Sequence, residues 1–284
     1  MQFTGIHALP PGLPTGRLVV PASAEDGQIY TDPVLWVSEE PQAAAGDLWA
    51  SLLEQRAETG LWPLLLLGVY VGKRVREMVP EELVRGRTHR PWHVGELEPV
   101  PAEGIADVDV GRVLARWWRE VVTGTGEEAF DFGEEALPEV PFRDWPGIVT
   151  LSGAGSDPDL TASRIVKSPE RLRELTGRDD PPFVGLVPAA DGAAAIATCG
   201  WPSSALDITE AAAVVRSWQE RFGARVCVLG INRLVMTVAR PPETFDEARR
   251  VAAEHLAFRK AFENNFDEYA RGLIGDQVWF FWWD

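Results

Sequence analysis

The sequence predicts an α+β protein, in which a C-terminal ferredoxin-like β-α-β-β-α-β module packs against an N-terminal α/β half. Apolar runs of strand length alternate with amphipathic runs of helix length on both sides of a long turn-rich stretch. The last part of the chain gives the element order β-α-β-β-α-β, which is the ferredoxin-like pattern. We therefore expect two units, an N-terminal half with its connecting segment over residues 1–150 and the ferredoxin-like module over residues 151–284.

Length and composition are those of a globular protein, with 284 residues of which 45 % are hydrophobic and 25 % are charged. No apolar run approaches the length of about 18 residues that a membrane span needs. The stretch MQFTGIHALPPGLPTG has neither the basic residues nor the apolar run of a secretory signal. Two cysteines, Cys199 and Cys227, lie in apolar stretches and are too few for a disulfide framework. We expect a cytoplasmic protein with no membrane contact and with both cysteines in the core.

The N-terminal half predicts the order strand, strand, helix, strand, helix. GRLVVPA and PVLWVSEEP are typical of strands that end at proline or turn residues. AAAGDLWASLLEQRAETG predicts a helix with Gly60 as its C-cap, and WPLLLLGVYV predicts a strand that is buried on both faces. VDVGRVLARWWREVV predicts a second amphipathic helix. The apolar positions of the two helices are Leu48, Trp49, Leu52 and Leu53 in the first and Val110, Val113, Leu114 and Trp117 in the second.

The connecting stretch, residues 123–160, is rich in Gly, Pro, Asp and Glu and has no helical period. It also carries aromatic residues that a free linker does not need, namely Phe130, Phe132, Phe142 and Trp145. We therefore expect this segment to lie against the surface and to tie the two halves together.

The C-terminal half begins with a predicted strand at residues 183–189. A short helical turn, DGAAAIATCGW, follows this strand. The next helix, TEAAAVVRSWQERFG, can be capped by Asp207 or Thr209 and ends at Gly223. ARVCVLGI and RLVMTVARP then predict a hairpin across residues 230–233.

Two helices and a last strand complete the predicted module. Thr244 and Glu247 form a capping box at the start of TFDEARRVAAEHLAF, and FDEYARGLIG predicts a shorter helix. In the terminal stretch QVWFFWWD, both sets of alternate positions are mainly apolar, so a strand here would have two apolar faces. In a ferredoxin-like sheet this strand would pair with the first strand and lie at an edge, where a bare apolar face favours aggregation. We therefore expect the N-terminal half to cover that face.

The histidines give weak signals for a metal site. His89 and His93 are four residues apart, as in helical zinc motifs. Pro91 lies between them and argues against the helix that this spacing requires. The nearby acids Glu96 and Glu98 do not restore the motif, and we predict no metal site here.

Other catalytic motifs are incomplete. His255 stands beside Glu254 and could act as a general base, but no nucleophile accompanies it. The loop GAGSDPD lacks the ending of a phosphate-binding loop, and no G-x-S-x-G elbow occurs. The acid pairs at 81–82, 134–135 and 179–180 come without the apolar surroundings that shift a pKa. The sequence predicts no catalytic residue and no cofactor.

Tryptophan is unusually frequent, with 12 residues. Several stand beside Gly or Pro, as in CGWP and DWPG, where an aromatic side chain can hold a ligand or anchor a partner. The alternative is that these residues pack in the core. If a binding cleft lies between the two halves, we expect the C-terminal module to line it with Trp201, Trp218, His255 and Trp283.

The net charge of −16 makes nucleic acid a poor partner, because phosphate binding needs clustered Lys and Arg. An acidic protein can instead attract a basic protein, and its electric field speeds their encounter. Acidic surfaces also serve simply to keep proteins in solution. The charge therefore favours a basic protein as a partner over nucleic acid.

Several stretches of the C-terminal half are distinctive, namely GLVPA, CGWP, RSWQERFGARV, VARPPETFDEARRVAAEH and VWFFWWD. In these stretches the chain resembles a bacterial, largely actinobacterial family, domain of unknown function 4253 (DUF4253). LWVSEEP, GLWPLLL, RPWHVGEL and LARWWREV extend the likeness to the longer members. After AAEH such proteins commonly continue into a Cys-Pro-Asp segment, whereas this chain has Arg259, Lys260 and Ala261, so a role for a thiol there does not apply. The resemblance implies no activity.

Three functions stay open at this point. The first is a non-catalytic protein-binding module with a basic partner, of which an immunity protein that neutralises a toxin would be one form. The second is a small-molecule-binding protein or enzyme with its site between the two halves, where ligand pockets often lie. The third is a structural homo-oligomer whose last strand pairs with that of a second copy. We rank the three in this order.

Overall fold

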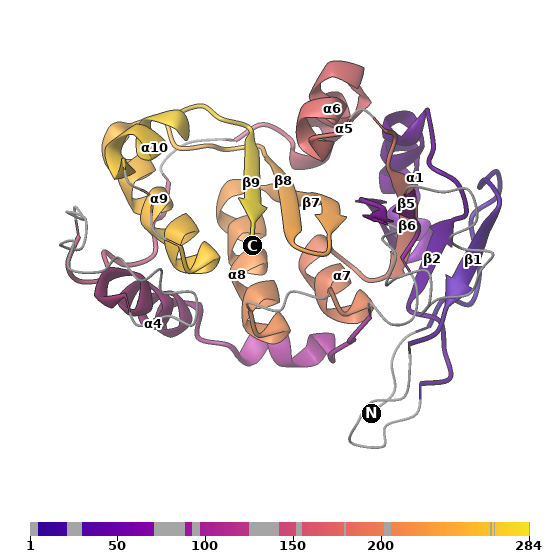
Figure 1. Cartoon of the computed structure of the whole chain (residues 1–284), viewed down its shortest axis with the longest axis horizontal. Coiled ribbons are helices and arrows are strands. Elements are labelled where there is room, and N and C mark those ends of the chain that lie inside the picture. Colours follow the sequence, from indigo (N-terminus) through magenta and orange to yellow (C-terminus); the bar gives the residue numbers. More distant parts are fainter. Residues whose placement is uncertain are drawn as a thin grey trace.

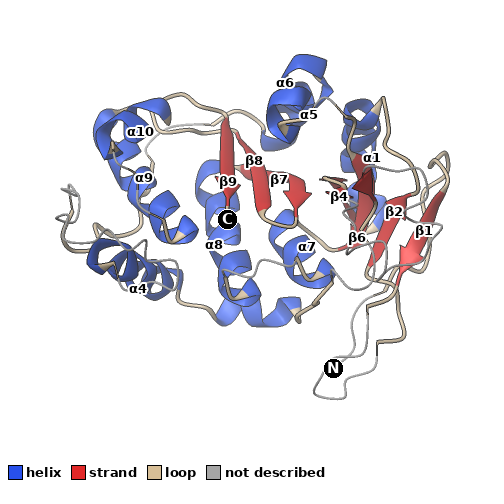
Figure 2. Ribbon diagram, in the orientation of Figure 1, coloured by secondary structure: helices blue, strands red, loops and turns tan. Residues whose placement is uncertain are grey.

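The computed structural model describes residues 5–21, 30–70, 89–92, 97–124, 142–151, 155–178, 180–201, 206–261, 263 and 265–283. In this part of the chain one mixed sheet has the strand order β1-β2-β6-β3-β7-β8-β9 (Figure 1, Figure 2), and β4 and β5 form a separate pair. The α+β class is confirmed. The strands are β1 (Gly16–Val19), β2 (Leu35–Ser38), β3 (Leu61–Leu66), β4 (Val69–Tyr70), β5 (His89–Arg90), β6 (Phe183–Pro188), β7 (Ala224–Gly230), β8 (Arg233–Val238) and β9 (Val278–Trp282).

Helices cover both faces of the large sheet. They are α1 (Ala45–Thr59), the 3-10 helix η2 (Ala102–Asp107), α4 (Val110–Thr123), α5 (Pro158–Lys167), α6 (Pro169–Thr176), α7 (Gly192–Cys199), α8 (Ile208–Phe222), α9 (Phe245–Arg259) and α10 (Phe266–Gly272). α7 and α8 pack on one face, and α1 and α5 contact the strands from the other. α9 lies beside β9, where His255 and Phe258 contact Trp279 and Phe281. α4 and α10 pack against α9 at this end of the molecule (Figure 1).

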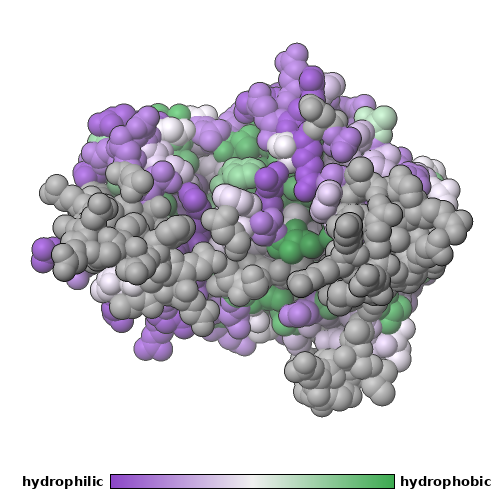
Figure 3. Space-filling view, viewed as in Figure 1, coloured by the Kyte–Doolittle hydropathy of each residue, from purple (hydrophilic) through white to green (hydrophobic). Residues whose placement is uncertain are grey.

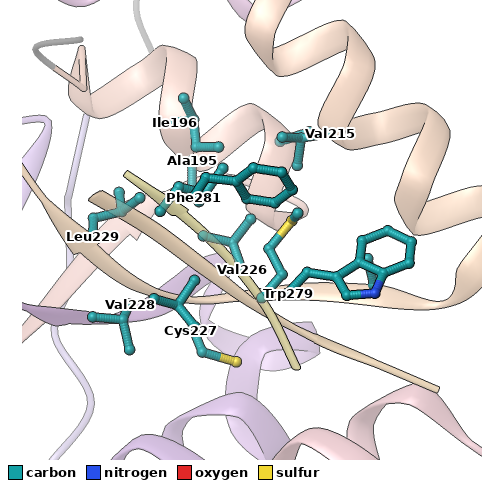
Figure 4. Close-up of a cluster of buried hydrophobic side chains, with 14 of the residues drawn as sticks. Ala195, Ile196, Val215, Val226, Cys227, Val228, Leu229, Trp279 and Phe281 are labelled. Atoms are coloured by element: carbon teal, nitrogen blue, oxygen red, sulfur yellow. The ribbon is translucent and has the colours of Figure 1, made fainter. Parts of the chain in front are cut away.

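The alternation of side chains along the strands divides the core into two layers. Val226, Trp279 and Phe281 point toward the helices α7 and α8, whereas Cys227 and Val228 point to the opposite side (Figure 4). The register of β7 against β8 shifts between Val226 and Val228, which is a β-bulge. A bulge inserts one extra residue. Two successive residues, Cys227 and Val228, therefore lie on the same face.

The start and stop signals of the helices are confirmed. The side chain of Asp207 accepts a hydrogen bond from a backbone N–H in the first turn of α8, and Thr244 and Glu247 form the predicted capping box of α9. Gly60 and Gly223 end α1 and α8 with φ of 67° and 61°. This left-handed conformation carries no steric cost for glycine.

The ferredoxin-like pairing is wrong. β9 pairs with β8 and not with β6, and β3 lies between β6 and β7. β3 runs antiparallel to β6 along its whole length and parallel to β7 at its end. All six residues of β3 are buried, so this strand needs a neighbour on each side as well as cover on each face. The strands of the two predicted halves therefore alternate in one sheet, and the boundary near residue 150 does not separate two sheets.

α5 and α6 were missed by the sequence prediction, which assigned turns as far as residue 160. Both helices begin with proline in the first turn, after the capping side chains of Asp157 and Ser168. Proline fits there because the first N–H groups of a helix have no intrahelical acceptor. Gly177, with φ of 60°, ends α6. The motifs S-D-P and K-S-P thus mark two helix starts, and α5 packs against β7 and β8.

Two predictions from composition can be compared with the structure. Cys199 and Cys227 are buried core residues as predicted, and burial raises the pKa of each thiol to about 12. None of the helices in the described ranges is long and apolar enough to cross a membrane.

Candidate protein-binding edge

The four residues predicted to line a cleft come together, but in a packed aromatic cluster. Trp201, Trp218, His255 and Trp283 have exposed fractions of 0 %, 0 %, 1 % and 3 %. The rings of Trp201 and Trp283 are 5.2 Å apart, and those of Trp218 and His255 are 5.4 Å apart. Phe281 lies between the two pairs, stacked on Trp218 at 5.2 Å. These side chains fill the space between α8, α9 and β9, and in the described residues they do not border an open cleft.

The indole groups of this cluster are held by hydrogen bonds to distant elements. Trp201 donates from Nε1 to the carbonyl oxygen of Gly230 at 2.7 Å. This bond ties the loop after α7 to the turn between β7 and β8. Trp218 donates from Nε1 to a carboxylate oxygen of Glu254 at 2.7 Å, which ties α8 to α9. Both residues are therefore anchors of the core.

His255 is a neutral core residue and has no access for general-base chemistry. Burial, with the guanidinium groups of Arg259 and Arg221, lowers its pKa to about 3. Its Nδ1 is 3.0 Å from the hydroxyl of Tyr269. Burial raises the pKa of Tyr269 to about 12, so this hydroxyl keeps its proton. The imidazole is thus an uncharged hydrogen-bonding member of the aromatic cluster.

The buried carboxylate of Glu254 forms an ion pair that sequence reasoning missed. Its side chain is fully buried, and Arg221 contacts its two oxygens at 2.8 and 2.6 Å. The backbone N–H of Val149 donates to the same carboxylate at 3.1 Å, and the carbonyl of Val149 accepts from Arg221 at 2.7 Å. These bonds fix the end of the connecting segment to α8 and α9. The acid beside His255 was the available signal, because a charged residue inside an apolar helix face requires a partner.

The packing of the connecting segment agrees with its predicted role where the structure describes it. Phe142 and Trp145 pack partly buried against the core, and Trp145 contacts Trp118 of α4. Phe130 and Phe132 lie outside the described residues, as do several weak site candidates of the sequence. These are Glu81, Glu82, His93, Glu96, Glu134, Glu135, Gly153 and Asp179.

The second face of β9 is open to solvent, which corrects the expectation that the N-terminal half covers it. Trp279 and Phe281 are buried toward α8, whereas the alternate residues Phe280 and Trp282 are 42 % and 44 % exposed. Figure 3 shows hydrophobic surface among hydrophilic residues in the region where Figure 1 draws β8 and β9. Two large aromatic residues therefore lie side by side on one face of an edge strand.

The backbone of β9 also presents free hydrogen-bonding positions. The residues that flank β9 bond toward the β8 side. The N–H of Val238 in β8 donates to the carbonyl of Gln277, and the N–H of Trp283 donates to the carbonyl of Asn232, just before β8. Because bonded and non-bonded pairs alternate in an antiparallel ladder, Val278, Phe280 and Trp282 direct their N–H and C=O groups away from β8. No strand in the described part of the chain pairs with that side.

Two side chains hold this edge in shape. The guanidinium of Arg233 lies 4.9 Å from the ring centre of Phe280, a cation–π contact that fixes the ring on the sheet surface. Asp276 accepts a hydrogen bond from the N–H of Val278 at 3.1 Å, which protects the first position of the free edge. The positions from Phe280 to Trp282 stay available for a further strand.

The comparisons with known proteins give one family match, in the C-terminal part of the chain. Residues 183–284 match the family model described as Domain of unknown function (DUF4253). The match confirms the resemblance over these residues, whereas the likeness of the N-terminal stretches to longer members stays a prediction. No curated protein and no solved structure matches the chain. Within the DUF4253 match lie β6 to β9, but β3, from outside it, separates β6 from β7 in the sheet. The matched segment therefore does not form this sheet alone.

Proposed function

We propose that this is a cytoplasmic, non-catalytic protein-binding module that takes an extended segment of a basic partner protein along the free side of β9. The observation that carries the proposal is the edge itself, in which outward backbone groups accompany the exposed rings of Phe280 and Trp282. An extended peptide that adds to a sheet edge gains main-chain hydrogen bonds, and its side chains meet those of the edge strand. Natural proteins normally protect an edge strand from pairing with other chains. An unprotected edge with exposed aromatic side chains therefore supports binding of a partner strand.

The alternation of β9 determines which side chains the partner segment needs. Val278, Phe280 and Trp282 share one face, so the added strand would place apolar residues at every second position opposite them. Cross-strand pairs of aromatic and β-branched residues contribute about 0.2–1 kcal/mol each. The aromatic rings supply contact area, and the backbone bonds supply the direction of the added strand.

Charge favours a basic partner over a second copy of this chain. The strand is bracketed by Asp276 and, in the sequence, by Asp284, and the whole chain has a net charge of −16. Symmetric antiparallel pairing of two copies about Phe280 would set Asp276 opposite Asp284 of the second copy. Like charges directly opposite each other destabilise a strand pair. A segment with Lys or Arg on both sides of its apolar residues would complement the same positions.

The proposal is tested with edge variants and a matched control. We would capture partners from the host lysate with the tagged protein and with the double variant Phe280→Lys, Trp282→Lys. The control is Leu18→Lys, because Leu18 is 48 % exposed on β1 at the opposite edge of the sheet. We expect a basic protein that is retained by the native chain and by Leu18→Lys, released as salt rises, and lost from the double variant. Equal capture by all three proteins would overturn the proposal.

Strand addition can be separated from other modes of binding with a synthetic peptide of the captured segment. Methylation of the peptide backbone nitrogens that face β9 removes hydrogen bonds, whereas methylation of the alternate nitrogens leaves them intact. We expect only the first set to abolish binding in calorimetry. Equal loss from both sets would contradict pairing at this edge.

A further inference from the structure

A small pocket lies at the end of the sheet where β2 and β3 finish and β6 begins. Its volume is about 220 Å³, and its floor includes Leu67, Gly68 and Phe183. Glu40 and His89 line it from the N-terminal part of the chain, and Arg178 comes from the loop after α6. The two predicted halves therefore meet in a site that is distinct from the β9 edge.

Gly68 makes room for this pocket. A Cβ atom at this position would lie 2.7 Å from Cε2 of Phe183 and 2.9 Å from Cβ of His89. Such distances are shorter than van der Waals contact, so a side chain here would push the ring of Phe183 or the strand β5 outward. The floor of the pocket thus requires glycine at this position.

Arg178 provides a positive charge at the wall of the pocket. It is half-buried and donates from one guanidinium nitrogen to the carbonyl of Gly68 at 3.0 Å. That bond holds the guanidinium in place while its other nitrogens stay available. Within the described residues no carboxylate forms an ion pair with Arg178. The remaining N–H groups of this half-buried guanidinium can therefore donate to an anionic group in the pocket.

A second guanidinium, that of Arg233, adds to the positive charge behind this wall. Arg233 donates to the carbonyl of Thr176 at 2.7 Å and packs against Gly177, just before Arg178. The structure gives it no carboxylate partner in the described ranges. Burial and the nearby charge of Arg178 both lower the pKa of Arg233, as expected for two cations that share a poorly solvated region.

His89 contributes a neutral hydrogen-bonding group. Its Nδ1 lies 3.8 Å from a carboxylate oxygen of Asp180, and its ring packs edge-on against Tyr70. Burial and the charge of Arg178 lower its pKa against the opposing effect of Asp180, so the imidazole is uncharged at neutral pH. The exposed acids Glu40 and Asp180 lie at the rim.

We propose that this pocket binds a small organic carboxylate, with Arg178 as its ionic partner and His89 as a hydrogen-bonding neighbour. The apolar floor of Leu67 and Phe183 accommodates the short carbon chain of the ligand. The volume of about 220 Å³ is below the range of about 300–1,000 Å³ typical of drug-sized ligands, so the ligand has few heavy atoms. The exposed carboxylate of Asp180 at the rim disfavours a second carboxylate and can accept an ammonium group, which gives amino acids an advantage over simple carboxylates.

Calorimetric titration of the full chain with propionate, L-alanine and propylammonium tests this proposal, at ionic strength matched with sodium chloride. We expect saturable binding of propionate and L-alanine with Kd values in the millimolar range. Tighter binding of L-alanine than of propionate supports the contact between the ligand ammonium group and the carboxylate at the rim. Equal binding of L-alanine and propionate supports only the contact between the ligand carboxylate and Arg178. Binding of propylammonium alone, or of no probe up to about 100 mM, would overturn the proposal.

Variants locate the binding at the pocket. Arg178→Gln is expected to weaken propionate binding by about tenfold or more, because a charge-assisted hydrogen bond is lost. Arg173→Gln, at an exposed arginine of α6, is the matched control and should leave binding unchanged. Gly68→Ala should also weaken binding, with a melting curve to show that the variant folds. Equal binding by the native chain and Arg178→Gln would exclude this pocket.

Discussion

The two faces of β9 have similar composition and opposite surroundings. Trp279 and Phe281 are 1 % and 0 % exposed beneath α8 and α9, whereas Phe280 and Trp282, between and beside them, are 42 % and 44 % exposed. Each face carries one phenylalanine and one tryptophan on the same strand. The difference lies in what covers each face. The aromatic rings of α8 and α9 pack against the first face, whereas α5 packs against β7 and β8 and reaches the start of β9 through the hydrogen bond from Arg164 to Gln277. Aromatic content alone therefore does not distinguish a core from a binding surface.

The largest expected effect comes from adjacent substitutions on the two faces. Phe281→Ala should lower the free energy of unfolding by about 3–5 kcal/mol, because it leaves a cavity among Trp218, His255 and Phe258. Phe280→Ala should cost less than about 1 kcal/mol, since this ring is already partly in water. Urea denaturation measures both. Equal losses in the two variants would mean that the exposed face is also part of the core.

The buried ion pair on the covered side gives the next prediction. Glu254→Gln should destabilise the protein by about 3 kcal/mol, because Arg221 would keep a buried charge without a partner. Glu174→Gln removes an ion pair to Arg171 that is exposed to solvent, and it should cost less than about 1 kcal/mol. Thermal unfolding of both variants provides the comparison. A small effect at Glu254 would show that Arg221 can leave the core.

The smallest effect, taken over a single pH unit, is a pH dependence that originates in the aromatic cluster. The pKa of His255 is lowered from 6.5 to about 3, so between these values the unfolded chain binds a proton that the folded chain does not. The contribution of this residue to stability is therefore present above about pH 6.5 and declines as the pH falls toward 3, by about 1.4 kcal/mol per pH unit. Urea unfolding of the native chain and of His255→Gln should differ by this slope. Identical slopes would place His255 in contact with solvent.

Local features of the fold could be predicted, and long-range ones could not. Asp207, Thr244 and Gly223 determine helix ends through contacts within one turn, so their sequence context was sufficient. The starts of α5 and α6 were equally readable at Asp157 and Ser168, but the acidic and glycine-rich stretch before them obscured the pattern. The position of β3 between β6 and β7 depends on which apolar strands meet, and no short stretch encodes that choice.

The candidate binding residues show the same difference between local features, which the sequence predicts, and long-range ones, which it does not. The sequence predicted that Trp201, Trp218, His255 and Trp283 line one cleft, and the structure brings their rings together. It could not decide that they form a packed cluster, since burial depends on α9 and β9 closing over them. The alternation in QVWFFWWD gave the two faces of β9 but not which face is covered. The open pocket at Arg178 brings together residues from distant parts of the chain, and no local pattern marks it.

The most direct test of the central claim is amide hydrogen exchange along β9, followed by NMR in the free protein and with its partner bound. In the free protein the amides of Phe280 and Trp282 should exchange much faster than those of Trp279 and Phe281, which bond to β8. Partner binding should slow the first pair to the level of the second. Equal protection of all four amides in the free protein, or fast exchange of Phe280 and Trp282 in the complex, would contradict a protein-binding role for this edge.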